Sequence, residues 1–197
     1  MKIHTSEFLK SAADLEGCPE SELPEFAFIG RSNVGKSSLL NMLTRSKGLA
    51  KVSSTPGATQ LINYFTINES WFMVDLPGYG YSKTPQKVRD GFQVMVSEYL
   101  ANRHSLRCVF VLVDSRHTPQ KIDLDFAEWL ANAGVPFVLA FTKIDKSKAG
   151  KVKSNVAAFL KSLSDRVDGE PRTFLTSAEK GTGRGEVLDF IDQALKS

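Results

Sequence analysis

Short runs of apolar residues alternate along the chain with stretches in which apolar residues recur every three or four positions. The short runs are rich in β-branched and aromatic residues, which is typical of buried strands. They predict six strands, over residues 26–29, 64–67, 71–74, 108–113, 136–141 and 172–175. The intervening stretches predict helices over residues 37–44, 86–102, 121–132, 150–163 and 185–195.

This order of elements predicts the fold class. Strands that alternate with helices are typical of right-handed βαβ units, which form a parallel sheet covered by helices on both faces. Residues 64–67 and 71–74 are separated by only three turn-like residues, so this pair is predicted as an antiparallel hairpin. The expected fold is therefore α/β, with a mostly parallel six-stranded sheet, helices on both faces and one antiparallel edge strand. Ligands of such sheets bind at the carboxyl ends of the strands.

Length and composition fit one domain. The 197 residues are 42% hydrophobic, which is enough for an ample core. We expect this domain to span residues 25–197, preceded by an N-terminal arm at residues 1–24, in which Phe8 and Leu9 either pack on the domain or belong to a loose segment. No apolar run is long enough to cross a bilayer, and the first residues lack the apolar stretch of a signal peptide. We therefore expect a cytoplasmic protein without a membrane partner.

A glycine-rich loop follows the strand predicted at residues 26–29. Two glycines with four residues between them, followed by Lys and Ser, are the pattern of a loop whose backbone N–H groups surround the phosphates of a nucleotide. Lys36 is expected to reach the β- and γ-phosphates, the Ser37 hydroxyl to coordinate Mg²⁺, and the following helix N-terminus to add its positive dipole end. A strand-turn-helix corner that happens to contain glycines is the alternative interpretation. The candidate nucleotide-binding residues here are Gly30, Arg31, Ser32, Asn33, Val34, Gly35, Lys36 and Ser37.

Two loops are expected to complete the phosphate and metal site. One follows the strand at residues 71–74, where the Asp75 carboxylate would hold Mg²⁺ through water and the Gly78 N–H would point at the γ-phosphate. The other contains Pro and Gly, and its Thr59 hydroxyl is the candidate to reach Mg²⁺ when the loop becomes ordered. A plain turn and an ordinary surface loop are the respective alternatives. The candidate residues are Gly57, Ala58, Thr59, Gln60 and Leu61 in one loop and Asp75, Leu76, Pro77 and Gly78 in the other.

Two further motifs predict which base is bound. The Asp145 carboxylate offers two acceptors, which match the N1–H and 2-amino group of guanine, whereas adenine would leave a charged acceptor unpaired. The Ala178 N–H is expected to donate to the guanine O6. GTP is thus predicted over ATP, and a charged loop at a helix entry is the alternative interpretation of the first motif. The candidate residues are Thr142, Lys143, Ile144 and Asp145, and then Thr176, Ser177 and Ala178.

Positive charge is concentrated late in the chain. The net charge is +3, but residues 143–172 carry +4, so the rest sums to −1. The lysines on or just before the helix at residues 150–163 could form a phosphate-facing surface, and a solvated helix face explains them equally well. They are Lys146, Lys148, Lys151, Lys153 and Lys161.

With these motifs, the chain resembles the EngB (YihA/YsxC) family of bacterial ribosome-biogenesis GTPases, within the TrmE-Era-EngA-EngB-Septin-like class of P-loop GTPases. The resemblance runs from residue 26 to the C-terminus and rests on residues 30–38, 55–60, 75–81 and 114–119. It implies a Ras-like GTPase domain that binds GTP or GDP with Mg²⁺ and hydrolyses GTP to GDP and phosphate. It also implies a role in assembly of the large ribosomal subunit, with rRNA and ribosomal proteins as partners, and in cell division and septation. We expect a monomer.

The sequence departs from Ras-like enzymes in the residues of hydrolysis. Tyr79 stands where those enzymes carry a glutamine that orients the attacking water, which predicts a low intrinsic rate or another group that positions the water. Arg31 is the nearest candidate for a built-in arginine finger. The resemblance suggests that Asn33 helps bind a K⁺ ion that offsets charge developing at the phosphates; the alternative is that Asn33 only braces the loop. The candidate catalytic residues are Asn33, Lys36, Thr59 and Gly78.

Two functions of different classes fit these features. The first is a GTP-driven switch whose loops rearrange with the γ-phosphate and alter affinity for a ribosomal precursor. The second is an RNA-binding or ribosome-binding module in which the nucleotide is structural. A nucleoside or nucleotide kinase is a weaker third option, since the motif at residues 142–145 would be out of place there. Thr142 stands where many GTPases carry Asn, and its hydroxyl can still brace the phosphate loop.

Overall fold

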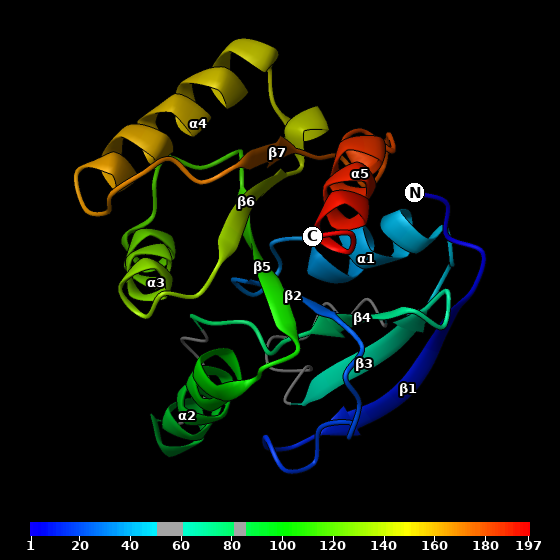
Figure 1. Cartoon of the computed structure of the whole chain (residues 1–197). Helices are drawn as coiled ribbons and strands as arrows, with labels where there is room; N and C mark the ends of the chain where they lie inside the picture. The colour runs from blue at the N-terminus through cyan, green and yellow to red at the C-terminus, as the bar shows by residue number, and fades with distance from the viewer. Residues whose placement is uncertain (51–60, 81–85) are drawn as a thin grey trace.

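A twisted sheet of seven strands forms the centre of the molecule (Figure 1). The computed structural model describes residues 1–50, 61–80 and 86–197, without the side chains of residues 86–93. The strands lie in the order β1-β3-β4-β2-β5-β6-β7. Their bounds are Ser6–Ala12 (β1), Glu25–Gly30 (β2), Ile62–Ile67 (β3), Trp71–Asp75 (β4), Leu106–Asp114 (β5), Phe137–Thr142 (β6) and Thr173–Leu175 (β7). The helices are Lys36–Thr44 (α1), Gln86–Asn102 (α2), Lys121–Asn132 (α3), Ala149–Ser164 (α4) and Arg184–Ala194 (α5), with a short 3₁₀ turn at Ile144–Lys146 (η1).

The α/β fold expected from the sequence is confirmed. All six predicted strands and all five predicted helices are present, and each end lies within two residues of its expected place. The strands β4, β2, β5, β6 and β7 are parallel, whereas β3 runs antiparallel to β4 as the hairpin predicts. The sheet therefore places the carboxyl ends of its parallel strands along one edge.

The number of strands differs from the expectation of six. Residues 6–12, in the segment expected as an N-terminal arm, form β1 and pair antiparallel with β3. Five consecutive side chains of β1 are exposed, so the strand has no hydrophobic alternation by which the sequence could have identified it. It is held mainly by backbone pairing and by the Phe8 ring, which packs edge-on against Phe65 at 5.9 Å between centroids. Such pairing needs the free edge of β3, which exists only once the rest of the sheet has folded.

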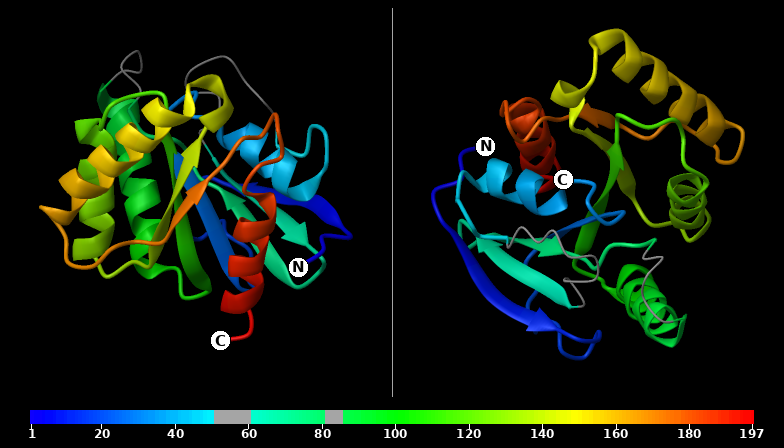
Figure 2. Two further views of the ribbon diagram at one scale, coloured as in Figure 1. Left: turned by 90° about the horizontal axis from the view of Figure 1, so that it is seen from above. Right: turned by 180° about the vertical axis from the view of Figure 1, so that it is seen from behind.

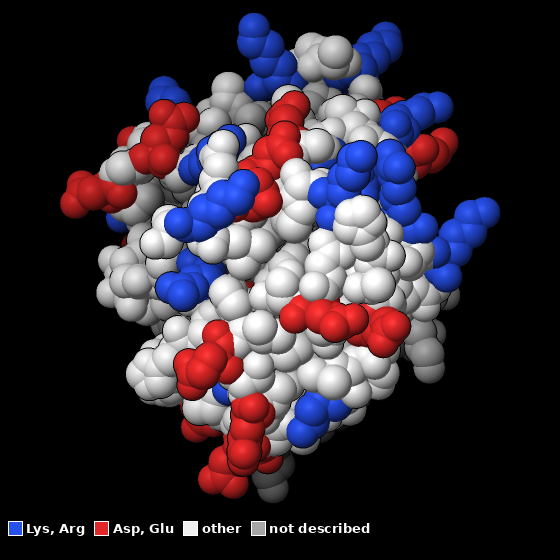
Figure 3. All heavy atoms as spheres, turned by 45° about the vertical axis from the view of Figure 1, so that its right-hand side comes forward, with Lys and Arg blue, Asp and Glu red and all other residues white. Residues whose placement is uncertain are grey.

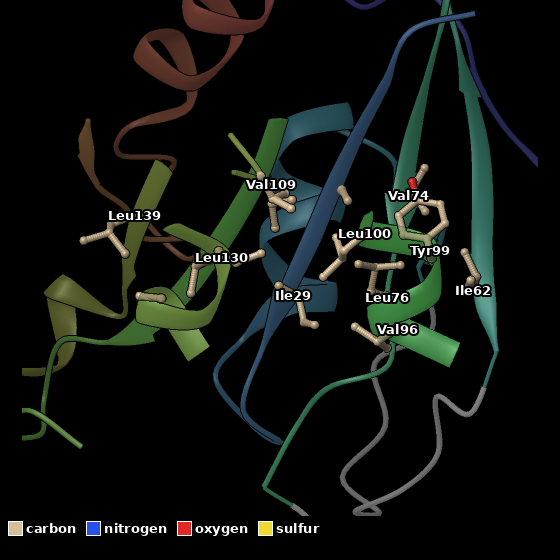
Figure 4. Close-up of a cluster of buried hydrophobic side chains, with 14 of the residues drawn as sticks. Ile29, Ile62, Val74, Leu76, Val96, Tyr99, Leu100, Val109, Leu130 and Leu139 are labelled. Carbon is tan, nitrogen blue, oxygen red and sulfur yellow. The ribbon is translucent and has the colours of Figure 1, made fainter. Parts of the chain in front are cut away.

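Helices cover the sheet on both faces (Figure 2). The first face packs against α2, α3 and α4, and Figure 4 shows the strand residues Ile29 and Val74 close to Tyr99 and Leu100 of α2. The second face packs against α1 and α5, where Phe110 of β5 lies among other aromatic side chains. Because successive strand side chains point to opposite faces, a strand buried on both sides must be apolar throughout, as β2 and β5 nearly are.

No helix in the described part of the chain is both long and apolar enough to cross a membrane.

One buried carboxylate lies at the end of the sheet opposite the carboxyl ends of the strands. Glu25, the first residue of β2, is fully buried and accepts hydrogen bonds from the Tyr99 hydroxyl at 2.6 Å and the Tyr64 hydroxyl at 3.2 Å. Arg103 donates through Nε at 2.7 Å and Ser105 donates at 2.8 Å. The charge is thus paired and hydrogen-bonded, which is the condition for burying a carboxylate at acceptable cost.

We predict that Glu25→Gln lowers the free energy of unfolding by about 3 kcal/mol, because it leaves Arg103 as a poorly compensated charge among groups that donate rather than accept. Urea unfolding followed by circular dichroism measures this change, with Glu22→Gln at an exposed position as the control. Equal midpoints for the two variants would contradict the role given to Glu25.

Candidate nucleotide and magnesium site

The phosphate loop lies between β2 and α1, as the sequence predicts. A Cβ atom on Gly30 would lie 2.8 Å from the Leu112 carbonyl oxygen and 3.0 Å from Val34 Cγ1, so only glycine fits at the end of β2. Asn33 and Gly35 have φ angles of 62° and 102°, in the left-handed region. Such alternation of backbone conformation turns successive N–H groups toward one concave side, which suits an anion.

The helix after the loop adds to this anion site. α1 begins at Lys36, and no side-chain hydrogen bond caps its first turn. N–H groups of an uncapped first turn and the positive end of the helix dipole favour phosphate oxygens at this position.

Lys36 and Asp75 meet as an ion pair across two neighbouring elements. Lys36 Nζ contacts Asp75 Oδ1, and both side chains are nearly buried. Asp75 ends β4, which pairs with β2 through Phe28, so the sheet register sets the carboxylate beside the phosphate loop. Burial lowers the pKa of Lys36 to about 7. The lysine expected at the phosphates and the aspartate expected near Mg²⁺ are therefore in direct contact.

The segment after Asp75 runs alongside the phosphate loop. The Leu76 N–H donates to the Phe28 carbonyl at 3.0 Å, and the Tyr79 N–H donates to the Gly30 carbonyl at 3.3 Å. Pro77 and Gly78 lie between these two anchors. The Gly78 N–H is therefore held next to the loop that would surround the phosphates.

The residues present fit a magnesium ion. Mg²⁺ prefers oxygen ligands and is commonly held by one or two side chains together with nucleotide phosphates and water. Ser37, in the first turn of α1, and the Asp75 carboxylate are oxygen donors on adjoining elements. In the described ranges no three His, Cys, Asp or Glu residues form a separate metal cluster. Thr59, the third expected ligand, lies outside the described residues, as do Gly57, Ala58 and Gln60; Leu61 is described and its side chain is 41% exposed.

The motif after β6 is tied to the phosphate loop by two side chains. The Thr142 hydroxyl donates to the Val34 carbonyl at 2.6 Å, which is the brace expected of it despite the departure from Asn. Lys143 has a φ of 59°, and its Nζ donates to the Asn33 carbonyl. The base motif and the phosphate loop therefore form one structural unit.

Asp145 is oriented by the third strand-end motif. It lies in η1, and a hydrogen bond from the Ser177 hydroxyl lowers its pKa, with Lys146 adding to the effect. The Ile144 N–H donates to the Thr176 carbonyl at 3.3 Å, so the two motifs are joined through their backbones as well. Ala178, which is partly buried, lies two residues after Thr176 and so close to the segment that carries Asp145.

A second carboxylate supports the base motif, and sequence reasoning assigned it no role. Asp114, the last residue of β5, accepts from Lys143 Nζ at 3.0 Å and from Arg116 Nε and Nη2 at 2.9 and 2.8 Å. Burial by itself would raise the pKa of Asp114, but the hydrogen bonds from Arg116 and Lys143 bring it well below its ordinary value. The signals in the sequence were its position at the end of a predicted strand and its place in the motif at residues 114–119.

The two candidates for charge stabilisation in hydrolysis have different surroundings. Asn33 is exposed at the tip of the phosphate loop. Arg31 instead has a carboxylate partner on α3, with its Nε 3.2 Å from Asp123 Oδ2.

The mostly parallel sheet brings to one edge the phosphate loop, the Asp75 carboxylate and the base motif, which follow one another along the chain in the order of the P-loop GTPases. This is the class of protein that the fold and site define. A family model described as "50S ribosome-binding GTPase" matches residues 25–143. The probable GTP-binding protein EngB of Bacteroides thetaiotaomicron is 51% identical over 196 residues, covering 100% of this chain and 97% of the relative. That of Flavobacterium psychrophilum is 51% identical over 194 residues, covering 98% and 95%. The chain belongs to the EngB family of GTP-binding proteins.

Solved structures agree on the fold. The crystal structure of a probable GTP-binding protein EngB matches with a TM-score of 0.67 at 23% identity, covering 87% of this chain and 98% of that one. Era in complex with MgGDPNP and nucleotides of 16S ribosomal RNA also matches with a TM-score of 0.67, at 21% identity, covering 88% of this chain and 56% of Era.

We predict that Asp145→Asn changes base preference from guanine toward xanthine, because an amide can donate to the carbonyl that xanthine carries in place of the 2-amino group. GDP affinity is expected to fall by roughly 10²-fold or more, while XDP affinity rises. Titration of both nucleotides measures the change, with Asp165→Asn at an exposed position as the control. Unaltered GDP binding by Asp145→Asn would overturn the assignment of this residue to the base.

Proposed function

We propose that this protein is a GTP-driven switch that hydrolyses GTP to GDP and phosphate and acts in assembly of the large ribosomal subunit. The observation that carries the catalytic part is the contact of Lys36 with Asp75 beside the phosphate loop. It brings together the cation and the carboxylate that GTP and Mg²⁺ would engage. Membership in a GTP-binding family supports the same activity.

Each residue has a defined part in this reaction. Lys36 and the N–H groups of the phosphate loop bind the phosphate oxygens, and Asp145 reads the base. Mg²⁺, when bound by Ser37, Thr59 and, through water, Asp75, supplies positive charge at the β- and γ-phosphates. The Gly78 N–H donates to the γ-phosphate, which makes the segment after β4 sensitive to whether that phosphate is present.

The Lys36–Asp75 ion pair is exchanged when nucleotide binds. Lys36, which contacts Asp75, would exchange the carboxylate oxygens for phosphate oxygens, and Asp75 would then be available to hold Mg²⁺ through water. Because a charged group leaving a buried partner is costly unless a new partner replaces it, the two steps should be coupled. The pair therefore keeps the site ordered before nucleotide arrives.

The ribosomal part rests on family membership and on surface charge. Lys148, Lys151, Lys153 and Lys161 are exposed on α4 or directly before it, whereas Lys146 is paired with Asp145 and Glu179 and belongs to the base site. Figure 3 shows that Lys and Arg also gather in the upper right of the face viewed there, while its lower part carries mostly Asp and Glu. Concentrated positive charge favours the phosphate backbone of RNA. Defects in cell division and septation would then follow from too few ribosomes in the cytoplasm, where a monomer would act on the precursor.

Nucleotide-dependent affinity separates this proposal from its alternative, a ribosome-binding module with a structural nucleotide. We predict that purified large-subunit particles retain the protein at least about tenfold better with a non-hydrolysable GTP analogue than with GDP, which corresponds to a coupling free energy of ordinary size for a switch. Co-sedimentation without nucleotide, with GDP and with the analogue measures this. Equal retention in all three would favour the module, and no retention in any would contradict the ribosomal role.

We further propose that K⁺ binds at Asn33 and stimulates an otherwise slow hydrolysis. A cation at the phosphates would offset charge that develops in the transition state. With ribosomal particles present, turnover in KCl is expected to exceed that in NaCl by about tenfold or more, and Asn33→Ala should remove the difference. Equal rates in the two salts for the unaltered protein would refute the proposal.

A further inference from the structure

A cluster of three side chains joins the phosphate loop, the segment after β4 and helix α3. The Tyr79 hydroxyl donates to Asp123 Oδ1 at 3.0 Å, and Arg31 Nε lies 3.2 Å from Asp123 Oδ2. Asp123 is 1% exposed, so its carboxylate is shielded from water, whereas the Arg31 side chain is partly exposed. Arg31 belongs to the phosphate loop and Tyr79 follows Gly78, so one carboxylate of α3 contacts both parts of the expected γ-phosphate site.

The local structure explains why Asp123 is held in this place. It lies in the first turn of α3, where the positive end of the helix dipole favours a carboxylate. Burial raises the pKa of Asp123, and the charge of Arg31 and the Tyr79 hydroxyl oppose that effect. The carboxylate therefore depends on these two partners, and their positions are in turn set by it.

Tyr79 is fixed by its ring as well as by its hydroxyl. The centroid of its ring lies 4.7 Å from that of Phe126, and the Phe126 ring in turn lies 5.9 Å from that of Trp129. The phenol group is thus turned toward α3 and engaged there. The backbone of Tyr79 lies beside the phosphate loop. It forms an isolated β-bridge with Arg31, and its N–H donates to the Gly30 carbonyl.

We propose that Asp123 is a positioning residue for the γ-phosphate, which holds Tyr79 and Arg31 so that the Gly78 N–H is presented at a set place beside the phosphate loop. The inference rests on the proposed GTPase function and deepens it. Tyr79, which stands where Ras-like enzymes carry a water-orienting glutamine, acts through its anchor on α3. A donor held in place before the reaction stabilises developing charge better than one that must be ordered at that moment.

This role predicts a difference between GTP and GDP. GDP would contact the phosphate loop and the base motif, which Thr142 and Lys143 join to each other. Only GTP has a γ-phosphate for the Gly78 N–H. If Asp123 merely stabilised α3, its loss would affect both nucleotides alike.

Two variants and one matched control test the proposal. Tyr79→Phe keeps the ring on Phe126 and removes only the hydroxyl, and Asp123→Asn keeps the size of the side chain and removes its charge. The control is Asp125→Asn, two residues further along α3, whose carboxylate pairs with Lys121 and Arg166 at the surface. Calorimetric affinity for GDP and for a non-hydrolysable GTP analogue is measured with Mg²⁺, together with the single-turnover rate at saturating GTP.

Both test variants are expected to lose affinity for the analogue, and rate of hydrolysis, by about tenfold, as for one hydrogen bond to a charged group. GDP affinity should change by less than about twofold, and Asp125→Asn should match the unaltered protein. An unchanged ratio of analogue to GDP affinity in Tyr79→Phe would overturn the role of Asp123 even if Asp123→Asn fails to fold. Failure of the unaltered protein to bind either nucleotide would instead refute the proposed function.

Discussion

The close approach of β2 and β5 at Gly30 is the constraint on which the site depends. At Gly30 the chain leaves a buried strand so close to the Leu112 carbonyl that no side chain fits there. It then turns and enters α1, whose first N–H groups have no side-chain cap. Any Cβ atom at Gly30 would push the phosphate loop away from β5 and hence from its braces on β6. The anion-binding shape of the loop is therefore a consequence of how tightly the sheet packs beneath it.

Sheet order then decides which side chains can meet the loop. β2 lies between β4 and β5, and β6 lies next to β5, so Asp75, Asp114 and Thr142 all end strands close to it. Asp75 contacts Lys36, while Thr142 and Lys143 hold the loop from the base-binding side. The segment expected to bind the base is thus joined directly to the phosphate loop through the carbonyl groups of Val34 and Asn33. Asp123 of α3 contacts the loop through Arg31.

Much of this arrangement could be predicted from the sequence because it depends on local rules. Apolar runs marked β2, β5 and β6, helical periodicity marked α3 and α5, and strand-end position singled out Asp75 and Asp145. β1 could not be predicted, since its exposed side chains carry no pattern and its stability depends on the edge of β3. The roles of Asp123 and the Glu25 cluster were missed for the same kind of reason, and Asp114 was noted only as part of the motif at residues 114–119. Asp123 and Glu25 have partners from distant parts of the chain, and Asp114 joins its near neighbour Arg116 to the distant Lys143, so only packing completes each group.

The central claim is that the loops at one edge of the sheet form a single site for a guanine nucleotide with Mg²⁺. Titration calorimetry of the purified protein with GDP, GTP and ADP in the presence of Mg²⁺ tests it most directly. The account predicts saturable heat with one molecule of GDP or GTP bound per chain and none with ADP. Absence of heat with both guanine nucleotides, or equal binding of ADP, would contradict it.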